Sequence, residues 1–371
     1  MEKNQIFKIY GTDYKQMVRT LLKECHLAEQ IGDINSRIGI KPNLVSPSEA
    51  SWGATTHPEI VEGIIEYLQK YGYTRISILE GSWVGDKTAE AVEVCGYDKL
   101  VQKYGVEFLD MQKDSFHMKD CGGMELALCD SVSDIDFLIN VPVLKGHCQT
   151  KITCALKNMK GLIPNKEKKH FHAMGLHKPI AHLNAGIHQD FIVVDHICGD
   201  LDFEDGGNPV VRNCIMAGVD PVLIDTYVCY LLHYKAEEVP YIIMAEQLGV
   251  GSTDLENADI RICGQDGDWT DRELPYAQKV VELKDTVEEV ESCSACYGYL
   301  LPALQRLKEE QLLDKLDKRI CIGQGYRGKS GELGVGLCTS GFAFCVKGCP
   351  PAEGQIYEEL KRYILEKDNI K

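Results

Sequence analysis

The stretch that decides the fold is SRIGIKPNLVSPSEASWGATTHPEIVEGIIEYLQKYGYTRISILE, residues 36–80. Its two ends, residues 36–41 and 75–80, are short and rich in isoleucine, which is typical of strands. The part between them begins near Pro58 and ends at Gly72, and both residues favour a helix there. This helix carries an apolar stripe formed by Ile60, Val61, Ile64, Ile65 and Leu68. A strand, a helix and a strand in this order predict a parallel pair joined by a crossover helix.

The same alternation continues along the first 280 residues. Further strands are predicted at residues 106–110, 136–143 and 191–195, and a further helix from Asp220-Pro221 to about residue 234. This pattern predicts the α/β class, with a mostly parallel sheet and helices on both faces. Residues 1–280 would form this domain, which ends in the polar stretch 265–285. Residues 281–371 would form a small cysteine-rich iron–sulfur module, with helices at 299–316 and 352–366 and a short strand at 319–322.

Composition restricts the classes of function. The chain has 371 residues and a formal net charge of −16, which argues against a nucleic-acid partner because phosphate binding needs a basic face. No run is long and apolar enough for a membrane span, and the N-terminus does not read as a signal peptide. We therefore expect a cytoplasmic protein. Its sixteen cysteines are then expected to be reduced thiols or metal ligands rather than disulfides.

The C-terminal cysteines form the most specific motif. Cys293 and Cys296 form C-x-x-C, and Cys349 lies in a Gly-Cys-Pro-Pro sequence of the kind found in cluster-binding loops. Soft thiolates suit iron–sulfur clusters or zinc. We expect a [4Fe-4S] cluster, and the ligands that we favour are Cys293, Cys296, Cys338 and Cys349, with Cys345 as the alternative to Cys338.

Two other uses of these cysteines stay open. Structural zinc is one, although zinc ribbons usually pair two C-x-x-C knuckles and this tail has one. A thioredoxin-type redox pair at Cys293 and Cys296 is another, but it leaves the remaining cysteines of the tail without a role. The letters G-x-G-x-x-G at residues 323–328 fall inside this module with no long helix after them, so we treat that match as chance.

Polar residues follow the predicted strands of the large domain. In open α/β sheets, ligands bind outside the carboxyl ends of the strands, so these residues predict one convergent site. We expect catalytic roles there for His57, Glu80, Lys145, His147 and Asp195. Glu80 and Asp195 could serve as general bases or as ligands of Mg²⁺.

Residues 141–172 form a basic island, with seven lysines against the single acid Glu167. Such an island suits a small anionic molecule. We expect its binding residues to be Lys41, Asn43, Thr56, Lys151, Lys157 and Asn158. Residues 166–169 are interpreted as a solvated charged loop, and His170 and His172 as structural or surface residues. Whether Asp225 faces this cleft stays open.

Several of these motifs together resemble the domain-of-unknown-function family 362. The similar segments, in order between about residues 35 and 235, are Lys41-Pro42-Asn43-Leu44-Val45, Thr55-Thr56-His57-Pro58-Glu59, Glu80-Gly81, the segments 141–147 and 150–161, and Gly218-Val219-Asp220-Pro221-Val222. The resemblance implies an α/β fold with iron–sulfur motifs toward the C-terminus, and it implies no reaction. Where some members are glycine-rich, residues 200–207 of this chain are acidic.

These observations lead to a hypothesis of function. We expect an anaerobic oxidoreductase in which a small anionic substrate binds in the α/β cleft beside the cluster. The alternative is a non-catalytic electron-transfer or cluster-delivery protein whose basic island docks an acidic redox partner. A third possibility is a Mg²⁺-dependent ligase or transferase with a structural cluster, although the chain has no phosphate-binding loop.

Overall fold

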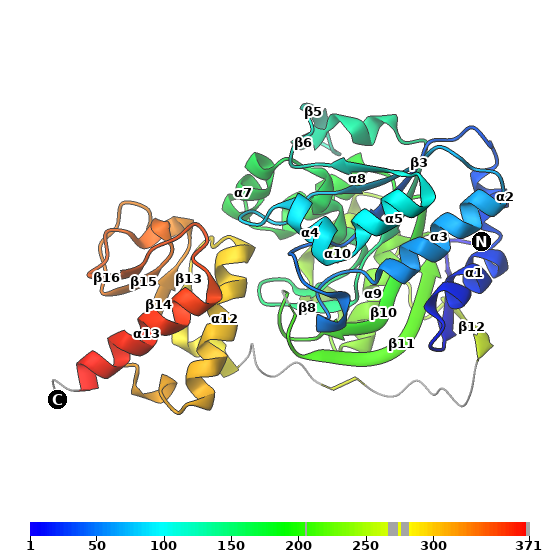
Figure 1. Cartoon of the computed structure of the whole chain (residues 1–371). Helices are drawn as coiled ribbons and strands as arrows, with labels where there is room; N and C mark the ends of the chain where they lie inside the picture. Colours follow the sequence, from blue (N-terminus) through cyan, green and yellow to red (C-terminus); the bar gives the residue numbers. More distant parts are fainter. Residues whose placement is uncertain (205, 266–273, 276–281, 369–371) are drawn as a thin grey trace.

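A mixed eight-stranded sheet forms the centre of the large domain. The computed structural model describes residues 1–204, 206–265, 274–275 and 282–368. The strands lie in the order β12-β1-β11-β10-β7-β2-β3-β4 (Figure 1). Their bounds are β1 Gln5–Tyr10, β2 Ile38–Pro42, β3 Ile76–Glu80, β4 Glu107–Asp110, β7 Phe137–Val141, β10 Phe191–Asp200, β11 Pro209–Gly218 and β12 Asp259–Gln265.

Most neighbouring strands of this sheet run parallel, as the sequence predicts. The exception is β11, which lies antiparallel to both β1 and β10. The five predicted strands correspond to β2, β3, β4, β7 and β10, whereas β11 and β12 were not predicted. The outer half of β11 is partly exposed, so its sequence lacks the continuous apolar run of a buried strand.

Helices cover both faces of the sheet, which confirms the predicted class. Side chains alternate along β10, so that Val193 packs in one core and Val194 in the other. The core of Val193 includes the helices α1 Tyr14–Glu24, α2 Leu27–Ile31, α3 Pro58–Lys70, α4 Thr88–Val94 and α5 Tyr97–Tyr104. The core of Val194 includes α6 Ala155–Asn158, α7 Asn165–Ala173, α8 His177–Gly186, α9 Pro221–Leu231 and α10 Pro240–Gln247.

Two short hairpins complete the large domain. They are β5 Phe116–Asp120 with β6 Glu125–Cys129, and β8 Lys145–His147 with β9 Lys151–Thr153. After β9 the chain forms α6 and then a 3-10 turn, η3 Met159–Leu162, so the middle of the basic island is compact and helical.

The C-terminal residues form a small unit with its own core and its own parallel sheet. This sheet has the order β13-β14-β15-β16, with bounds Val287–Glu289, Ile320–Ile322, Leu333–Val335 and Phe344–Val346. Its helices are α12 Ser294–Glu309 and α13 Glu353–Asp368. The predicted helix 299–316 therefore has wrong bounds: the helix begins directly after Cys293, so Cys296 lies in its first turn. The predicted domain boundary at residue 280 lies outside the described residues.

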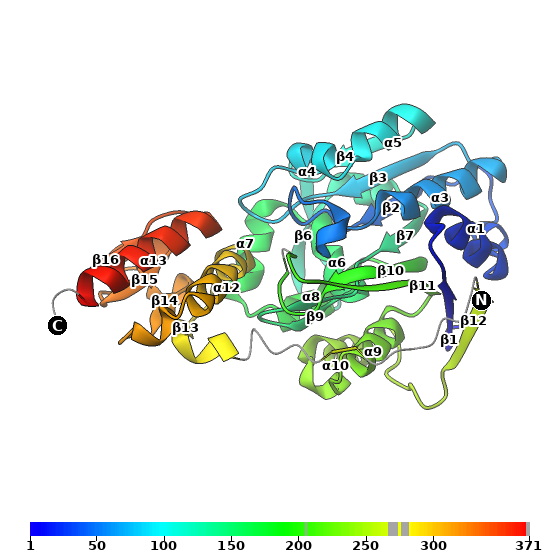
Figure 2. The same ribbon diagram turned by 60° about the horizontal axis from the view of Figure 1, so that its bottom comes forward.

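The start of α12 packs against the large domain close to α7, as Figures 1 and 2 both show. Gln149 Nε2 donates to Ser292 Oγ at 3.0 Å, and Ser294 Oγ donates to Gln149 Oε1 at 3.1 Å. Farther along α12, the ring of Tyr299 meets the ring of Trp83 edge to face, with centroids 5.2 Å apart. These contacts bring the C-x-x-C segment to the surface of the α/β domain.

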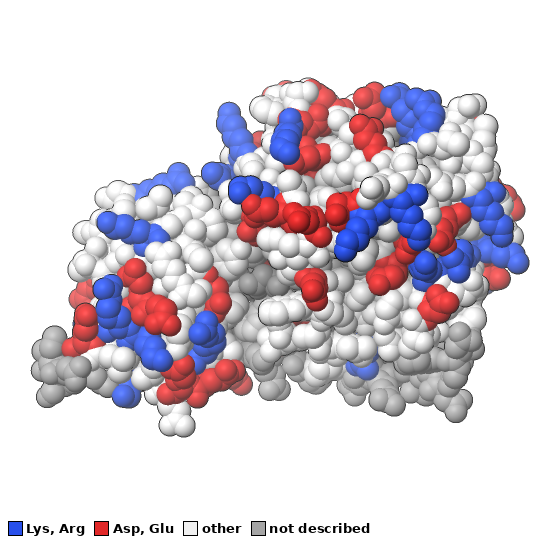
Figure 3. Space-filling view, in the orientation of Figure 1, with Lys and Arg blue, Asp and Glu red and all other residues white. Residues whose placement is uncertain are grey.

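Charged side chains of both signs intermingle on the face of the molecule shown in Figure 3. Across residues 1–204, 206–265 and 282–368, no helix combines the length and the apolar character that crossing a membrane requires.

Candidate functional site

An open cavity lies where β2 and β3 end and where α12 meets the large domain. Its volume, open solvent at the mouth included, is about 590 Å³. It brings together five of the predicted site residues, which are Lys41, Asn43, Glu80, Lys157 and Asn158. The cavity is thus at the carboxyl ends of parallel strands, where the sequence places it.

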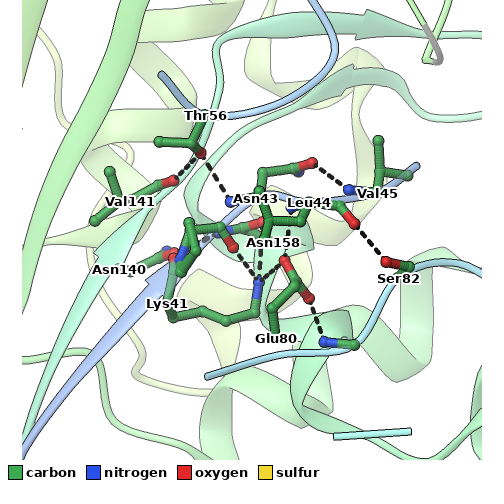
Figure 4. A network of polar contacts seen from close by, with 12 residues as sticks. Lys41, Asn43, Leu44, Val45, Thr56, Glu80, Ser82, Asn140, Val141 and Asn158 are labelled. Carbon is green, nitrogen blue, oxygen red and sulfur yellow. Dashed lines mark hydrogen bonds and ion pairs between the residues drawn. The ribbon is translucent and has the colours of Figure 1, made fainter. Parts of the chain in front are cut away.

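A buried ion pair forms one wall of this cavity (Figure 4). The Lys41 ammonium lies 2.8 Å from Oε2 of Glu80 and also donates to Asn158 Oδ1 at 3.3 Å. The Glu80 carboxylate accepts two backbone N–H groups as well, from Leu44 at 2.9 Å and Gly81 at 2.7 Å. Burial lowers the pKa of Lys41, and the charge of Glu80 opposes this shift. Both oxygens of Glu80 are therefore already bound by donors of the protein.

The Lys41–Glu80 ion pair lies so close to the backbone of residue 161 that only glycine fits at that position. A β-carbon at Gly161 would lie 1.9 Å from Oε1 of Glu80 and 2.7 Å from Nζ of Lys41. No side chain fits there unless the ion pair moves. The glycine of η3 thus allows the basic island to close over the ends of β2 and β3.

A second carboxylate, Glu204, comes from the acidic loop after β10. Its Oε1 lies 2.5 Å from the Lys157 ammonium, and its Oε2 lies 2.8 Å from His147 Nε2. Burial raises the pKa of Glu204, but His147 and Lys157 outweigh burial and hold it well below its ordinary value. Glu204 was not among the predicted site residues. The sequence signal that could have indicated Glu204 is the acidic stretch 200–207, because carboxylates there could pair with the lysines of the predicted basic site.

His147 supports Glu204 from behind rather than lining the cavity. Its Nδ1 accepts backbone N–H groups from Gln149 at 3.0 Å and Thr150 at 3.1 Å, so the ring proton of neutral His147 is on Nε2, facing Glu204. Burial lowers the pKa of His147 to about 4. His147 is therefore a neutral imidazole at physiological pH.

Two lysines that were not selected as site residues also line the cavity. Lys168 is on α7 and donates to the carbonyl oxygens of Gly81 and Ser82, both at 2.8 Å. The prediction of a solvated loop at residues 166–169 is wrong for this residue, because α7 turns Lys168 inward while Lys166 and Lys169 remain exposed. Lys160, on η3, is the other. Burial lowers the pKa of Lys160 to about 7 and that of Lys168 to about 8.

His172 lines the same cavity, although it was interpreted as structural or surface. Its Nε2 lies 3.4 Å from both the backbone N and the Oγ of Ser294, at the start of α12. Its Nδ1 is buried and has no hydrogen-bond partner among the described residues. Burial lowers the pKa of His172 well below its ordinary value. His170 points to solvent instead.

Two predicted catalytic residues, His57 and Asp195, form a separate buried cluster that does not line the cavity. Asp195 Oδ2 lies 2.8 Å from His57 Nδ1 and accepts the His57 backbone N–H at 2.7 Å. Burial alone would lower the pKa of His57, but the charge of Asp195 outweighs it and raises the pKa to about 10. His57 is thus an imidazolium that is paired with the carboxylate of Asp195.

The remaining predicted residues do not line the cavity. Lys145 donates to the carbonyl oxygens of Ala54 and Glu204, both at 2.7 Å. Thr56 donates its hydroxyl to the Val141 carbonyl at 2.8 Å. Lys151 pairs with Glu238 at 2.6 Å on the surface. Asp225 accepts the N–H groups of the first turn of α6 and does not line the cavity.

A second cavity lies between the C-terminal unit and Val84 and Lys169 of the large domain, and it is lined by the four favoured cysteines, Cys293, Cys296, Cys338 and Cys349. Cys345 is outside it, and its Sγ lies 3.4 Å from both Gly336 O and Thr339 Oγ1. Arg327 Nε donates to Cys338 Sγ at 3.5 Å. Burial, together with the charges of Cys338 and Cys349, raises the pKa of Cys293. Four thiolates here would repel each other, so the donor set fits a cationic group shared among them.

The two cavities adjoin. Val84, Cys293 and Ala295 line both of them, so a cysteine of the second cavity is also part of the wall of the lysine-lined cavity. In the described part of the chain, no three His, Cys, Asp or Glu side chains are arranged to hold a single metal ion.

Comparisons with known proteins give one family match and a few distant likenesses. The family model described as a domain of unknown function, DUF362, matches residues 38–230. The thylakoid-associated protein sll1697 of Synechocystis sp. is 24% identical over 251 residues, which cover 64% of this chain and 76% of that protein.

Two solved structures are distantly similar to this chain. The lactate racemase apoprotein from Thermoanaerobacterium thermosaccharolyticum is 14% identical with a TM-score of 0.40, over 62% of this chain and 58% of that one. A protein from Thermotoga maritima is 15% identical with a TM-score of 0.38, over 64% of this chain and 60% of that one. The chain therefore spans less than two thirds of either solved protein.

Proposed function

This chain belongs to the DUF362 family, and we propose that it is an iron–sulfur oxidoreductase that acts on a small anionic substrate in the lysine-lined cavity. The observation that carries this proposal is the wall shared by the two cavities. Cys293 is one of four cysteines around the second cavity, and it also borders the space where the substrate would bind.

Cys293, Cys296, Cys338 and Cys349 would hold the cofactor, a [4Fe-4S] cluster. When bound, such a cluster supplies or accepts single electrons. Arg327 would hydrogen-bond the Cys338 sulfur, a contact of the kind that tunes cluster potentials. We prefer a cluster to zinc because zinc ribbons usually pair two C-x-x-C knuckles and this tail has one.

The basic cavity would bind and orient the substrate. Lys168 is buried with its ammonium against two carbonyl oxygens, and Lys160 lines the same space. Positive charges in a partly enclosed cavity attract an anion more strongly than lysines on the surface. Glu204 and its partners, His147 and Lys157, would keep the opposite side rigid.

The alternative, a non-catalytic electron carrier, is favoured by one observation. Cys349 is exposed and Leu337 beside Cys338 is 51% exposed, so the second cavity is close to the surface where a redox partner protein could dock. Lys166 and Lys169 of the basic island are exposed, but Lys145, Lys157 and Lys168 are buried and offer such a partner no surface. Their burial favours a small ligand.

The proposal is tested on protein purified without oxygen. We expect a brown protein with broad visible absorption and about four iron and four sulfide ions per chain. Serine in place of Cys293, Cys296, Cys338 or Cys349 should remove most of this iron. Cys345→Ser is the matched control and should retain it, because the Cys345 sulfur is outside the cavity. A colourless protein with one zinc ion and no iron would contradict the proposal.

The enzyme and the carrier hypotheses differ in whether a small anion that binds in the lysine-lined cavity affects the cluster. For an enzyme, a small anion that binds in the cavity should change the electron paramagnetic resonance spectrum of the reduced protein, and Lys168→Gln should abolish that change. For a carrier, no small anion changes the spectrum, and Lys168→Gln leaves electron exchange with an external protein unchanged.

A further inference from the structure

Two of the four lysines that line the cavity have no carboxylate partner. The carboxylates of the cavity are Glu80 and Glu204, and they pair with Lys41 and Lys157. When all four lysines are protonated, four positive charges against two negative charges leave two positive charges, those of Lys160 and Lys168. Burial lowers the pKa values of these two lysines to about 7 and about 8, and an anion bound beside them would raise both pKa values again.

Neither of these two charges has an ion-pair partner of its own among the described residues, although Glu204 attracts Lys160 and Glu80 attracts Lys168 from farther away. Lys168 is 4% exposed, and the partners of its ammonium are the carbonyl oxygens of Gly81 and Ser82, which carry no net charge. Lys160 lines the cavity, and no hydrogen-bond or ion-pair partner for its ammonium is found in the described ranges. Uncompensated charges away from water are costly, so proteins normally pair them.

Neutral groups that favour an anion surround the two lysines. His172 lines the cavity and is 6% exposed, and its Nδ1 has no hydrogen-bond partner among the described residues. Ser294 and Ala295, in the first turn of the sixteen-residue helix α12, border the same space. The N-terminus of a helix of this length attracts negative charge through its free N–H groups.

We propose that the cavity binds a dianion, either a dicarboxylate or a phosphate monoester, whose two negative charges compensate Lys160 and Lys168. A monoanion would leave one of the two ammonium groups unpaired. This inference deepens the proposed function, and it rests on that function for the claim that the bound dianion is a substrate. The binding itself needs only the charges and the cavity.

The experiment is calorimetric titration of the full chain, purified without oxygen, with malonate, inorganic phosphate and acetate at pH 7.5. At least one of the two dianions should bind about tenfold or more tightly than acetate, since the second charge-assisted contact is lost with a monoanion. A preference for malonate identifies the dicarboxylate class, and a preference for phosphate identifies the phosphate esters. Equal affinity for all three anions, or no binding, overturns the inference.

Three variants assign the binding to the two lysines. Lys160→Gln and Lys168→Gln should each weaken dianion binding about tenfold or more, while Lys160→Arg keeps most of it. Lys166→Gln is the control, because Lys166 is exposed on the same helix as Lys168. Circular dichroism checks that each variant is folded.

One other role for the lysines gives a different result. If they only balance the charge of the cysteine sulfurs, Lys160→Gln should lower the iron content and leave dianion affinity unchanged, which overturns the inference. Iron content measured on the same samples separates the two proposals. Dianion binding by a protein without iron contradicts the proposed function alone, and an iron-loaded protein that binds no dianion contradicts this inference alone.

Discussion

His147 shows how much of the cavity depends on the protonation of one buried residue. The ring accepts two backbone N–H groups on Nδ1 and faces Glu204 through Nε2. A second proton would have to displace one of those N–H groups. Burial is the main cause that lowers the pKa of His147 from 6.5 to about 4.

The lowered pKa of His147 predicts a loss of stability in mild acid. The unfolded chain takes up this proton near pH 6.5, whereas the folded chain takes it up only near pH 4. The stabilisation is thus complete above pH 6.5 and is lost as the pH falls toward 4. Between pH 7 and pH 5 the free energy of unfolding should fall by about 2 kcal/mol on account of this group.

Urea unfolding at the two pH values, followed by tryptophan fluorescence, measures this loss. His147→Asn should show a fall that is smaller than that of the wild type by about the same 2 kcal/mol. His117→Asn is the control, because His117 is exposed on β5. An unchanged pH dependence in His147→Asn would show that this histidine does not titrate as the contacts require.

At this scale the sequence predicted residues whose position follows from the strands. Lys41 and Glu80 end β2 and β3, so the carboxyl ends of the sheet bring them together. Glu204 and Lys168 were missed because their positions depend on how a loop and a helix fold back over the sheet. A charge run such as residues 166–169 does not reveal which of its members a helix turns inward.

Among the elements, α6 contributes two lining residues to the cavity although it has only four residues. Its four residues, Ala155–Asn158, include both Lys157 and Asn158. A helix this short is not stable by itself. Asp225, from the buried helix α9, holds it by accepting the N–H groups of Ala155 at 2.7 Å and Leu156 at 3.1 Å.

We expect Asp225→Ala to weaken both folding and ligand binding. Two buried N–H groups would lose their acceptor, which should cost about 2 kcal/mol or more in the free energy of unfolding. Malonate affinity should fall as well, because Lys157 is carried by the helix that loosens. The same urea and calorimetric measurements check both effects.

Asp220→Ala is the matched control for this element. Asp220 caps α9 by accepting the N–H groups of Val222 and Leu223, and it does not line the cavity. Its loss should cost about 1 kcal/mol of stability and leave malonate affinity unchanged. Equal effects of the two substitutions on affinity would contradict a specific role for Asp225.

Element boundaries show where sequence patterns stop being informative. The stripe of α3 and the strands on either side of it were readable because they repeat at regular spacing. The first turn of α12 was not, since Ser294-Ala295-Cys296 has no apolar stripe of its own and the C-x-x-C motif is usually found in a loop. That turn matters, because it places Cys293 at the start of the helix.

At the scale of the whole molecule, Gln149 joins the two units next to the cysteines. Its amide group donates to Ser292 and accepts from Ser294, one on each side of Cys293. Gln149→Ala should therefore loosen residues 292–296, with amide hydrogen exchange there about tenfold faster, which corresponds to about 1.4 kcal/mol.

Mass spectrometry of deuterium uptake measures this change peptide by peptide. Gln305→Ala is a control on the same helix, because the Gln305 amide donates to Glu309 within α12. Unchanged exchange in Gln149→Ala would show that other contacts, such as that of Trp83 with Tyr299, hold the two units together.

The sequence led us to expect a basic cleft beside the cysteine module, but it could not predict which residues bring the two units into contact. The lining of the cavity comes from residues 41 to 295, which are distant in the chain and include both units. No local pattern encodes such a contact. It depends on the fit between the start of α12 and the surface that α7 and Trp83 provide.

The wall that contains Cys293 has a consequence for the energetics of both cavities. A negative ligand on one side and negative charge on the sulfur on the other repel each other through this single residue. Free-energy coupling between two sites is reciprocal. If a bound ligand makes extra negative charge on the sulfur side less favourable by some factor, that extra charge therefore lowers the affinity for the ligand by the same factor. Binding of an anion in the lysine-lined cavity and addition of negative charge in the second cavity then oppose each other. A change in one can be followed by measuring the other.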